Sequence, residues 1–187
     1  WQEIDAVSPA DFTAFEKLVL ASLRNALQQT AVDLQDPRTL FVLASTKGNI
    51  GLLKAGSEDP QQITSLQGSA KKIADQLHYH STPVVVSNAC ISGMTALLTE
   101  KRLMDAGLYD HAVVVGADCI SPFIVAGFRS FQALSDEVCK PFDLHRKGIN
   151  LGEGAATIIL SKIPSAVRLA GGSTSSDANH ISGPSRT

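Results

Sequence analysis

The sequence predicts an α/β fold built on a largely parallel sheet that is covered by helices. Residues 83–86 and 112–116 are short apolar runs that suit buried strands, and residues 95–106 between them have the apolar spacing of a helix. A strand, a helix and a second strand in this order are typical of parallel strands joined by a right-handed crossover. The apolar run Thr39–Ala44 predicts a further strand that is buried on both faces.

The remaining elements follow the chain in order. Ser8 and Pro9 suit the cap and the first position of a helix with one apolar face, which we expect to continue to residue 26. A second helix is expected from residue 57 to about residue 78. Near the end of the chain, residues 155–160 and 167–170 predict two strands that are close enough in sequence to form a hairpin.

The composition describes a chain that can bury one substantial core. Its 187 residues are 44% hydrophobic, and 16 basic against 18 acidic side chains give a net charge of −2. Such a chain does not remain disordered, and it lacks the basic excess that binding to nucleic acid or to an anionic membrane surface requires. No apolar run reaches the roughly 20 residues that span a bilayer.

The cysteines bear on the cellular compartment, and the first residues bear on whether the chain is part of a longer protein. Cys90, Cys119 and Cys139 are too few for a secreted disulfide framework, so they favour a reducing, cytoplasmic compartment. The chain opens on Trp1 without an initiator Met, a basic start or an apolar signal core. We therefore expect it to begin inside a longer protein.

The turn at residues 87–93 carries the strongest signal of chemistry. Cys90 follows a predicted buried strand and precedes a helix, and ligands of parallel sheets bind at this edge. The unpaired N–H groups and positive dipole end of the helix favour a thiolate at Cys90, and they could hold an oxyanion on an attacked acyl carbon. A single cysteine is nevertheless more often a small core residue than a nucleophile, so position alone leaves both interpretations open.

Four segments, in order along the chain, resemble those of the β-ketoacyl-acyl carrier protein synthases. One contains Cys90, one precedes the family's Pro-Phe-Asp motif, one contains that motif and a glycine-rich stretch, and one resembles the segment that carries the family's first catalytic histidine. The match runs from about Phe41 to Thr187 and covers most of the chain. The segments are residues 87–93, 127–135, 139–155 and 175–184.

The resemblance implies a thiolase-like fold, in which each of two similar halves has a mixed five-stranded sheet covered by helices. Residues 1–171 would form the N-terminal half, and residues 172–187 would be the truncated start of the C-terminal half. The family's first strand would precede Trp1, and its second catalytic histidine, supporting lysine and C-terminal glycine-rich loop would follow Thr187. We therefore expect the isolated chain to be inactive.

The resemblance also implies a decarboxylative Claisen condensation of an acyl thioester with malonyl-acyl carrier protein, in fatty acid or polyketide-like biosynthesis. Cys90 would carry the acyl group, and His180 would donate a hydrogen bond to the enolate oxygen of the malonyl thioester. Phe131 and Ile91 would bind substrate, with Phe131 near the acyl pocket. Without the resemblance, His180 would be interpreted as a solvated loop histidine, and Phe131 would fit an ordinary core residue equally well.

No cofactor and no metal site are expected. His78 and His80 lie at a predicted helix end with no further ligand nearby in sequence. Glu153 lies between glycines that allow a tight turn, so we expect it to hold loop N–H groups or Arg146 rather than to act as an acid or base. Asp143 and Arg146 are expected to form a structural ion pair.

The sequence leaves two alternatives to a condensing enzyme open. A non-catalytic partner subunit of a ketosynthase heterodimer would typically lack the nucleophile, whereas a coenzyme A-dependent thiolase-like acyltransferase would differ in its later motifs.

The resemblance implies the acyl carrier protein as one partner. It also implies a homodimer or heterodimer through an edge strand running from Ala112 to Gly116, with residues 123–131 near the neighbour's pocket. The sequence does not specify acyl chain length or starter preference.

Overall fold

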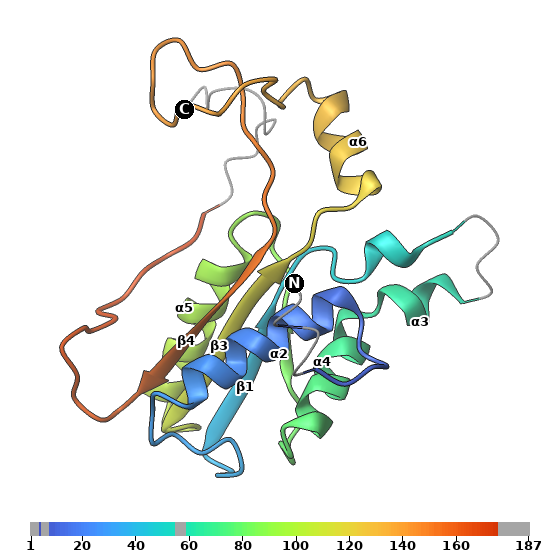
Figure 1. Cartoon of the computed structure of the whole chain (residues 1–187). Coiled ribbons are helices and arrows are strands. Elements are labelled where there is room, and N and C mark those ends of the chain that lie inside the picture. The colour runs from blue at the N-terminus through green and yellow to red at the C-terminus, as the bar shows by residue number, and fades with distance from the viewer. Residues whose placement is uncertain (1–3, 5–7, 55–58, 176–187) are drawn as a thin grey trace.

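The computed structural model of the chain describes residues 4, 8–54 and 59–175. A four-stranded sheet lies between helices that cover both of its faces (Figure 1). The strands are β1 (Thr39–Ala44), β2 (Val84–Val86), β3 (His111–Asp118) and β4 (Gly154–Ser161). The helices are α2 (Ala14–Leu27), α3 (Pro60–Thr64), α4 (Leu66–Gln76), α5 (Ser92–Asp105) and α6 (Pro122–Ser130), with a short 3₁₀ helix, η1 (Ile50–Leu52).

The sheet is mixed, with the strand order β2–β1–β3–β4. β1 is parallel to both β2 and β3, which confirms the predicted parallel sheet, and β4 is antiparallel to β3. The described residues supply four strands where the resemblance implies five. The strand that the resemblance adds before Trp1 is not part of this sequence.

The predicted dimer edge at the strand from Ala112 to Gly116 is wrong. This strand is β3, and it is hydrogen-bonded to β1 on one side and to β4 on the other. β4 pairs with β3 along its whole length, from His111 opposite Ser161 to Asp118 opposite Gly154. Since both sides of β3 are occupied, another chain cannot add to it by strand pairing.

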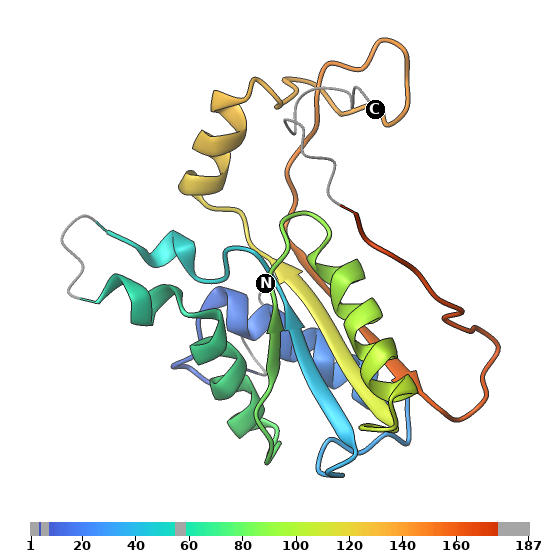
Figure 2. The ribbon, with the colours of Figure 1, turned by 180° about the vertical axis from the view of Figure 1, so that it is seen from behind.

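The core divides into two clusters because the side chains of β1 alternate between the two faces of the sheet. Phe41 and Leu43 pack on the face covered by α2 and α4, whereas Leu40 and Val42 pack on the face covered by α5. Figure 2 shows the same three layers from behind. Every residue of β1 is buried, as predicted.

Two helix predictions need correction. The first helix begins at Ala14 rather than near Ser8, because Thr13 and Glu16 form a reciprocal capping box that fixes the start. The helix predicted from residue 57 is divided into α3 and α4 by Ser65, whose extended backbone ends one helix while its side chain caps the next. The first two residues of that prediction lie outside the described residues.

Differences also occur at the strands near the site and at the end of the described chain. β2 is half-buried rather than buried, because it lies at an edge of the sheet. The hairpin predicted from residues 155–160 and 167–170 does not form: the first run is β4, but residues 167–170 have no regular structure. The chain instead leaves the sheet, and the close approach of Gly172 to Leu98 shows that it passes α5.

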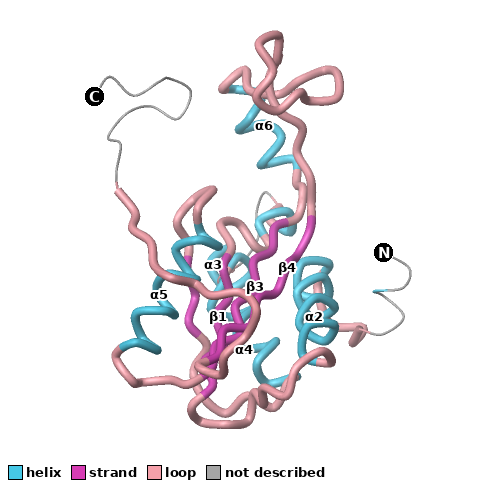
Figure 3. The backbone as a smooth tube through the Cα atoms, turned by 90° about the vertical axis from the view of Figure 1, so that its left-hand side faces the viewer, coloured by secondary structure: helices cyan, strands magenta, loops and turns pink. Residues whose placement is uncertain are grey.

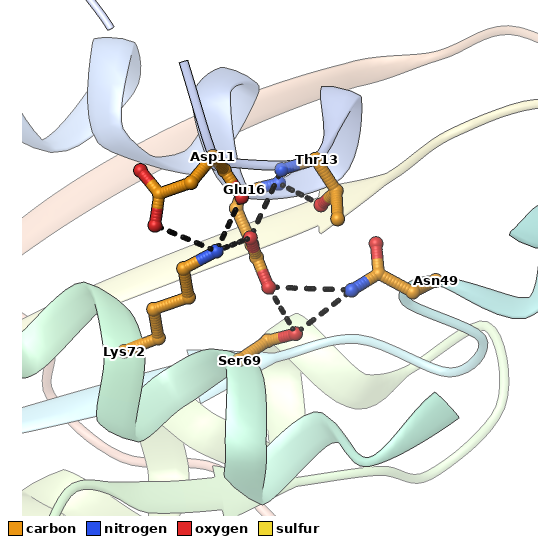
Figure 4. Close-up of polar contacts among 6 residues, drawn as sticks. All are labelled: Asp11, Thr13, Glu16, Asn49, Ser69 and Lys72. Atoms are coloured by element: carbon orange, nitrogen blue, oxygen red, sulfur yellow. Dashed lines mark hydrogen bonds and ion pairs between the residues drawn. The ribbon is translucent and has the colours of Figure 1, made fainter. Parts of the chain in front are cut away.

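A buried polar network ties α2, α4 and the loop after β1 together (Figure 4). Glu16 Oε1 accepts hydrogen bonds from Ser69 Oγ at 2.9 Å and Asn49 Nδ2 at 3.3 Å, and Lys72 Nζ lies 3.2 Å from Glu16 Oε2. Burial by itself raises the pKa of Glu16. The hydrogen bonds from Thr13 N–H, Ser69 and Lys72, together with the charge of Lys72, outweigh burial and lower this pKa overall.

α6 differs from the other long helices because it buries none of its residues. Figure 3 shows that it projects beyond the carboxyl ends of the parallel strands, with the loop that follows it. Within the described part of the chain, no helix has both the length and the apolar character that crossing a membrane requires.

Candidate active site

Cys90 lies in a tight turn that joins β2 to α5 at the carboxyl end of the parallel strands. Ile91 N–H donates to Asn88 O at 3.1 Å, and Ser92 N–H donates to Ala89 O at 3.2 Å. Ser92 Oγ closes the turn, since it accepts from Asn88 N–H at 2.8 Å and donates to Ala89 O at 2.7 Å. Ala89 has a φ of +44°, a left-handed conformation that L residues rarely adopt and that often marks functional turns.

This turn presents the thiol of Cys90 to solvent immediately before the helix. α5 begins at Ser92, three residues earlier than predicted, with Ile91 as its N-cap. Cys90 is exposed, so it is not the small core residue that the sequence left open. Among the hydrogen bonds of the described residues, the N–H groups of Ile91 and Ser92 are used within the turn, whereas the Cys90 N–H donates to no backbone carbonyl.

The Cys90 turn forms one wall of a cavity of about 680 Å³. The other walls come from the carboxyl ends of β1 and β3, from the start of β4 and from the region of α6. Such a position is where ligands of open α/β sheets bind. The lining residues are Ala44, Thr46, Lys47, Ala89, Cys90, Ser92, Gly93, Gly116, Ala117, Asp118, Cys119, Ile120, Ile124, Phe128, Leu151, Gly152, Gly154, Ala155 and Ala156.

Cys119 is a second thiol that lines the same cavity. Burial raises the pKa of Cys119 to about 11, and the carboxylates of Glu153 and Asp118 add to the rise. Cys119 is therefore a neutral thiol near pH 7, and a neutral thiol is a poor nucleophile. Cys139 is not a lining residue; its N–H donates to Asn150 Oδ1 at 2.7 Å in the loop after α6.

The two side chains assigned to substrate binding are about half exposed. Ile91 is 44% exposed and Phe131 is 49% exposed, and neither is among the residues that line the cavity. Their roles stay predictions. The apolar wall is formed instead by Ile120, Ile124 and Phe128, which we did not select from the sequence. Ile124 and Phe128 lie four residues apart in α6, and this spacing was the available signal, since side chains four residues apart share one helical face.

The sequence also assigned roles to His180 and Glu153. His180 lies outside the described residues, so its role stays a prediction. Glu153 holds a loop N–H group as predicted, because its Oε2 accepts from Ile120 N–H at 3.2 Å.

The predicted ion pair between Asp143 and Arg146 is wrong. Arg146 Nη1 donates to the backbone oxygen of Asp143 at 3.0 Å, whereas the Asp143 carboxylate accepts from His145 N–H at 2.7 Å. An aspartate side chain that bonds the N–H two residues onward forms a local turn, so the Asp143 carboxylate is engaged with the backbone instead of the guanidinium. The described residues contain no group of three or more His, Cys, Asp or Glu side chains that could hold a metal ion.

The fold and the cysteine-lined cavity define a thiolase-like condensing-enzyme domain. The family described as beta-ketoacyl synthase, N-terminal domain, matches residues 2–166, and the chain belongs to this family. One chain of the solved complex between the ketosynthase ApeO and its chain length factor ApeC from Xenorhabdus doucetiae superimposes with a TM-score of 0.69 at 25% identity, over 86% of this chain and 46% of that one.

Two curated relatives are similar to about half of the chain. The chain is 34% identical over 114 residues to the ketoacyl synthase alpha subunit of the tetracenomycin polyketide synthase of Streptomyces glaucescens, covering 53% of this chain and 27% of the relative. It is 34% identical over 112 residues to 3-oxoacyl-[acyl-carrier-protein] synthase 2 of Synechocystis, covering 51% and 27%. The chain spans less than half the length of each of these three proteins.

Proposed function

We propose that the chain is the N-terminal part of a 3-oxoacyl-[acyl-carrier-protein] synthase in which Cys90 carries the acyl group. The observation that supports this most strongly is the exposed Cys90 thiol, which a tight turn presents to a cavity of about 680 Å³. Family membership supports the reaction class, a condensation of fatty acid or polyketide synthesis. We place the protein in the cytoplasm, where its three free thiols stay reduced.

The reaction begins with transfer of the acyl group to the enzyme. The Cys90 thiolate attacks the acyl carbon of the donor thioester, the bond from that carbon to the carrier's sulfur breaks, and the carrier thiolate takes up a proton. One thioester replaces another, so this exchange is nearly neutral in free energy. The Cys90 N–H is oriented by the turn and has no backbone acceptor in the described chain, so it is available to the oxyanion that forms during the attack.

Condensation follows on the acylated enzyme. The malonyl thioester loses its carboxyl group as carbon dioxide, and the electron pair left on its α-carbon attacks the acyl carbon on Cys90. The bond between that carbon and the cysteine sulfur breaks, which frees the thiolate and yields a 3-oxoacyl thioester. His180 is proposed to stabilise the enolate oxygen by donating a hydrogen bond, and the family's second histidine would act beside it.

The proposed enzyme also binds substrate through two apolar side chains and pairs with a second subunit. Phe131 and Ile91 would contact the acyl chain from the rim of the site, because both are partly exposed near the Cys90 turn or at the end of α6. A second subunit would cover the exposed apolar side chains of α6, such as Phe123, which is 58% exposed. A complete protein that elutes as a clean monomer on gel filtration would contradict this interface.

Condensation is tested with the complete protein, acyl- and malonyl-acyl carrier protein, and mass detection of the product. We expect one 3-oxoacyl product and one carbon dioxide per malonyl group consumed, and no product from Cys90→Ala. A protein that forms product only with coenzyme A thioesters would instead be a thiolase-like acyltransferase. A protein that condenses nothing alone but restores an active ketosynthase would be a non-catalytic partner subunit.

A further inference from the structure

The loop at residues 45–49 follows β1 and is fastened at its first end to the end of β3. Ser45 Oγ donates to Asp118 Oδ1 at 2.9 Å, and Thr46 N–H reaches the same oxygen at 3.4 Å. Gly48 N–H donates back to Ser45 Oγ at 3.4 Å. Gly48 has a φ of +47°, and a Cβ there would lie 2.6 Å from the Leu66 side chain, so the loop turns where only glycine fits easily.

The second end of the loop is fastened by the buried network drawn in Figure 4. Asn49 is buried and donates to Ser69 Oγ at 3.0 Å and to Glu16 Oε1 at 3.3 Å. These partners belong to α4 and α2, which are themselves packed on the sheet. The loop is therefore held between the sheet and two helices, and its backbone conformation is fixed by buried hydrogen bonds.

Lys47 is the residue that this rigid loop presents to the cavity. It is exposed, and it is the single basic residue among the described residues that line the cavity. Its Nζ lies 5.8 Å from the centroid of the Phe123 ring, an arrangement that directs the ammonium toward α6. Within the described part of the chain no carboxylate pairs with it, and Asp118, the one acid of the lining, uses Oδ1 for Ser45 and Thr46.

We infer that Lys47 binds the carboxylate of the malonyl thioester and so selects an anionic extender. This inference rests on the proposed function, because both Lys47 and Cys90 line the cavity in which the two substrates would meet. The acyl donor carries no charge on its acyl chain, whereas the extender brings a carboxylate into the same cavity. A fixed cation there attracts the extender and does not act on the neutral acyl group.

Lys47 is thereby a binding residue whose contact is lost during the reaction. The carboxylate leaves as neutral carbon dioxide, so the ion pair is weaker in the transition state than in the bound ground state. Removing the cation should raise KM for the extender without lowering kcat. An exposed ion pair of this kind corresponds to about a fivefold change in KM.

The test separates the two half-reactions in the complete protein. We expect Lys47→Gln to raise KM for malonyl-pantetheine about fivefold with kcat unchanged or higher, and Lys47→Arg to restore the wild-type KM. Acylation of Cys90 by a neutral acyl-pantetheine should proceed at the wild-type rate in both variants. Lys71→Gln removes an equal charge from α4, outside the cavity lining, and should leave both half-reactions unchanged.

An unchanged KM in Lys47→Gln would overturn the inference, as would an equal loss in the acylation step. A KM effect shared by Lys71→Gln would also overturn it, because it would show that overall charge rather than position is responsible. Failure of the proposed function has a different signature: the wild-type protein would neither acylate Cys90 nor condense malonyl groups.

Discussion

The side chain of Glu100 gives the sharpest test of how the sheet and α5 are packed. Glu100 is 0% exposed, and neither of its carboxylate oxygens has a hydrogen-bond partner in the described structure. Ala96 and Met104, one helical turn to either side, belong to the apolar cluster between α5 and the sheet. Burial without a compensating partner raises the pKa of Glu100 from 4.5 to about 7.

The sign of the pH dependence follows from this direction. Between pH 4.5 and about 7, the folded protein keeps the Glu100 proton that the unfolded chain releases. The free energy of unfolding is therefore not reduced by Glu100 below about pH 4.5, and it falls as the pH rises toward 7. Since one pKa unit corresponds to about 1.4 kcal/mol, the loss over this window is about 3 kcal/mol.

Glu100→Gln keeps the shape of the side chain and removes its titration. Denaturant unfolding of the complete protein, followed by far-ultraviolet circular dichroism at pH 4.5 and pH 7.5, should show that wild type loses about 3 kcal/mol relative to the variant. The exposed Glu137→Gln serves as the control for removing one surface carboxylate and should change the unfolding free energy by less than about 1 kcal/mol. Equal unfolding free-energy changes in wild type and Glu100→Gln between the two pH values would show that Glu100 is solvated or paired.

Three further predictions follow from single contacts. The pKa of Glu16 is lowered in the folded protein, so the Glu16 carboxylate stabilises the fold above its unfolded pKa, and this stabilisation is lost as the pH falls. Wild type should therefore exceed Glu16→Gln in unfolding free energy by more at pH 6 than at pH 3. A difference that is the same at both pH values would contradict this. Gly148 has a φ of +126°, and a Cβ there would lie 2.6 Å from Ala133 O, so Gly148→Ala should cost about 2 kcal/mol or more; an unchanged thermal midpoint would exclude the close approach. With iodoacetamide at pH 7, the exposed Cys90 should be alkylated well before Cys119, whose rate should rise steeply only toward pH 11; equal rates at pH 7 would contradict the raised pKa of Cys119.

Much of the fold could be predicted because its strongest signals are local. The apolar runs of β1 and β3 are buried strands as expected, since each is long enough and apolar enough to exclude other structures. The position of β3 within the sheet was missed because strand order depends on which segment pairs with it, and β4 lies more than thirty residues later. Pairing of distant strands leaves no mark in the sequence of either strand alone.

The site shows the same division between local and distant signals. Cys90 became a candidate because a strand, a turn of small residues and a helix are contiguous in sequence, and the resemblance of residues 87–93 to the family's active-cysteine segment then favoured a nucleophile over a core residue. The cavity wall was missed because it depends on which face of α6 turns inward. The structure selects Phe128 for that wall, while Phe131 lies outside the lining. Both are apolar residues of one segment, so only the three-dimensional arrangement distinguishes them.

Of the three thiols, Cys90 alone is proposed to carry the acyl intermediate. The complete protein is incubated with an acyl-acyl carrier protein in the absence of malonyl groups, digested with protease, and analysed by mass spectrometry. We predict that the acyl mass is found on the peptide that contains Cys90 and that Cys90→Ala abolishes the adduct, whereas Cys119→Ala and Cys139→Ala retain it. An acyl mass on the peptide of Cys119 or Cys139, or an adduct that persists in Cys90→Ala, would exclude Cys90 as the acyl carrier.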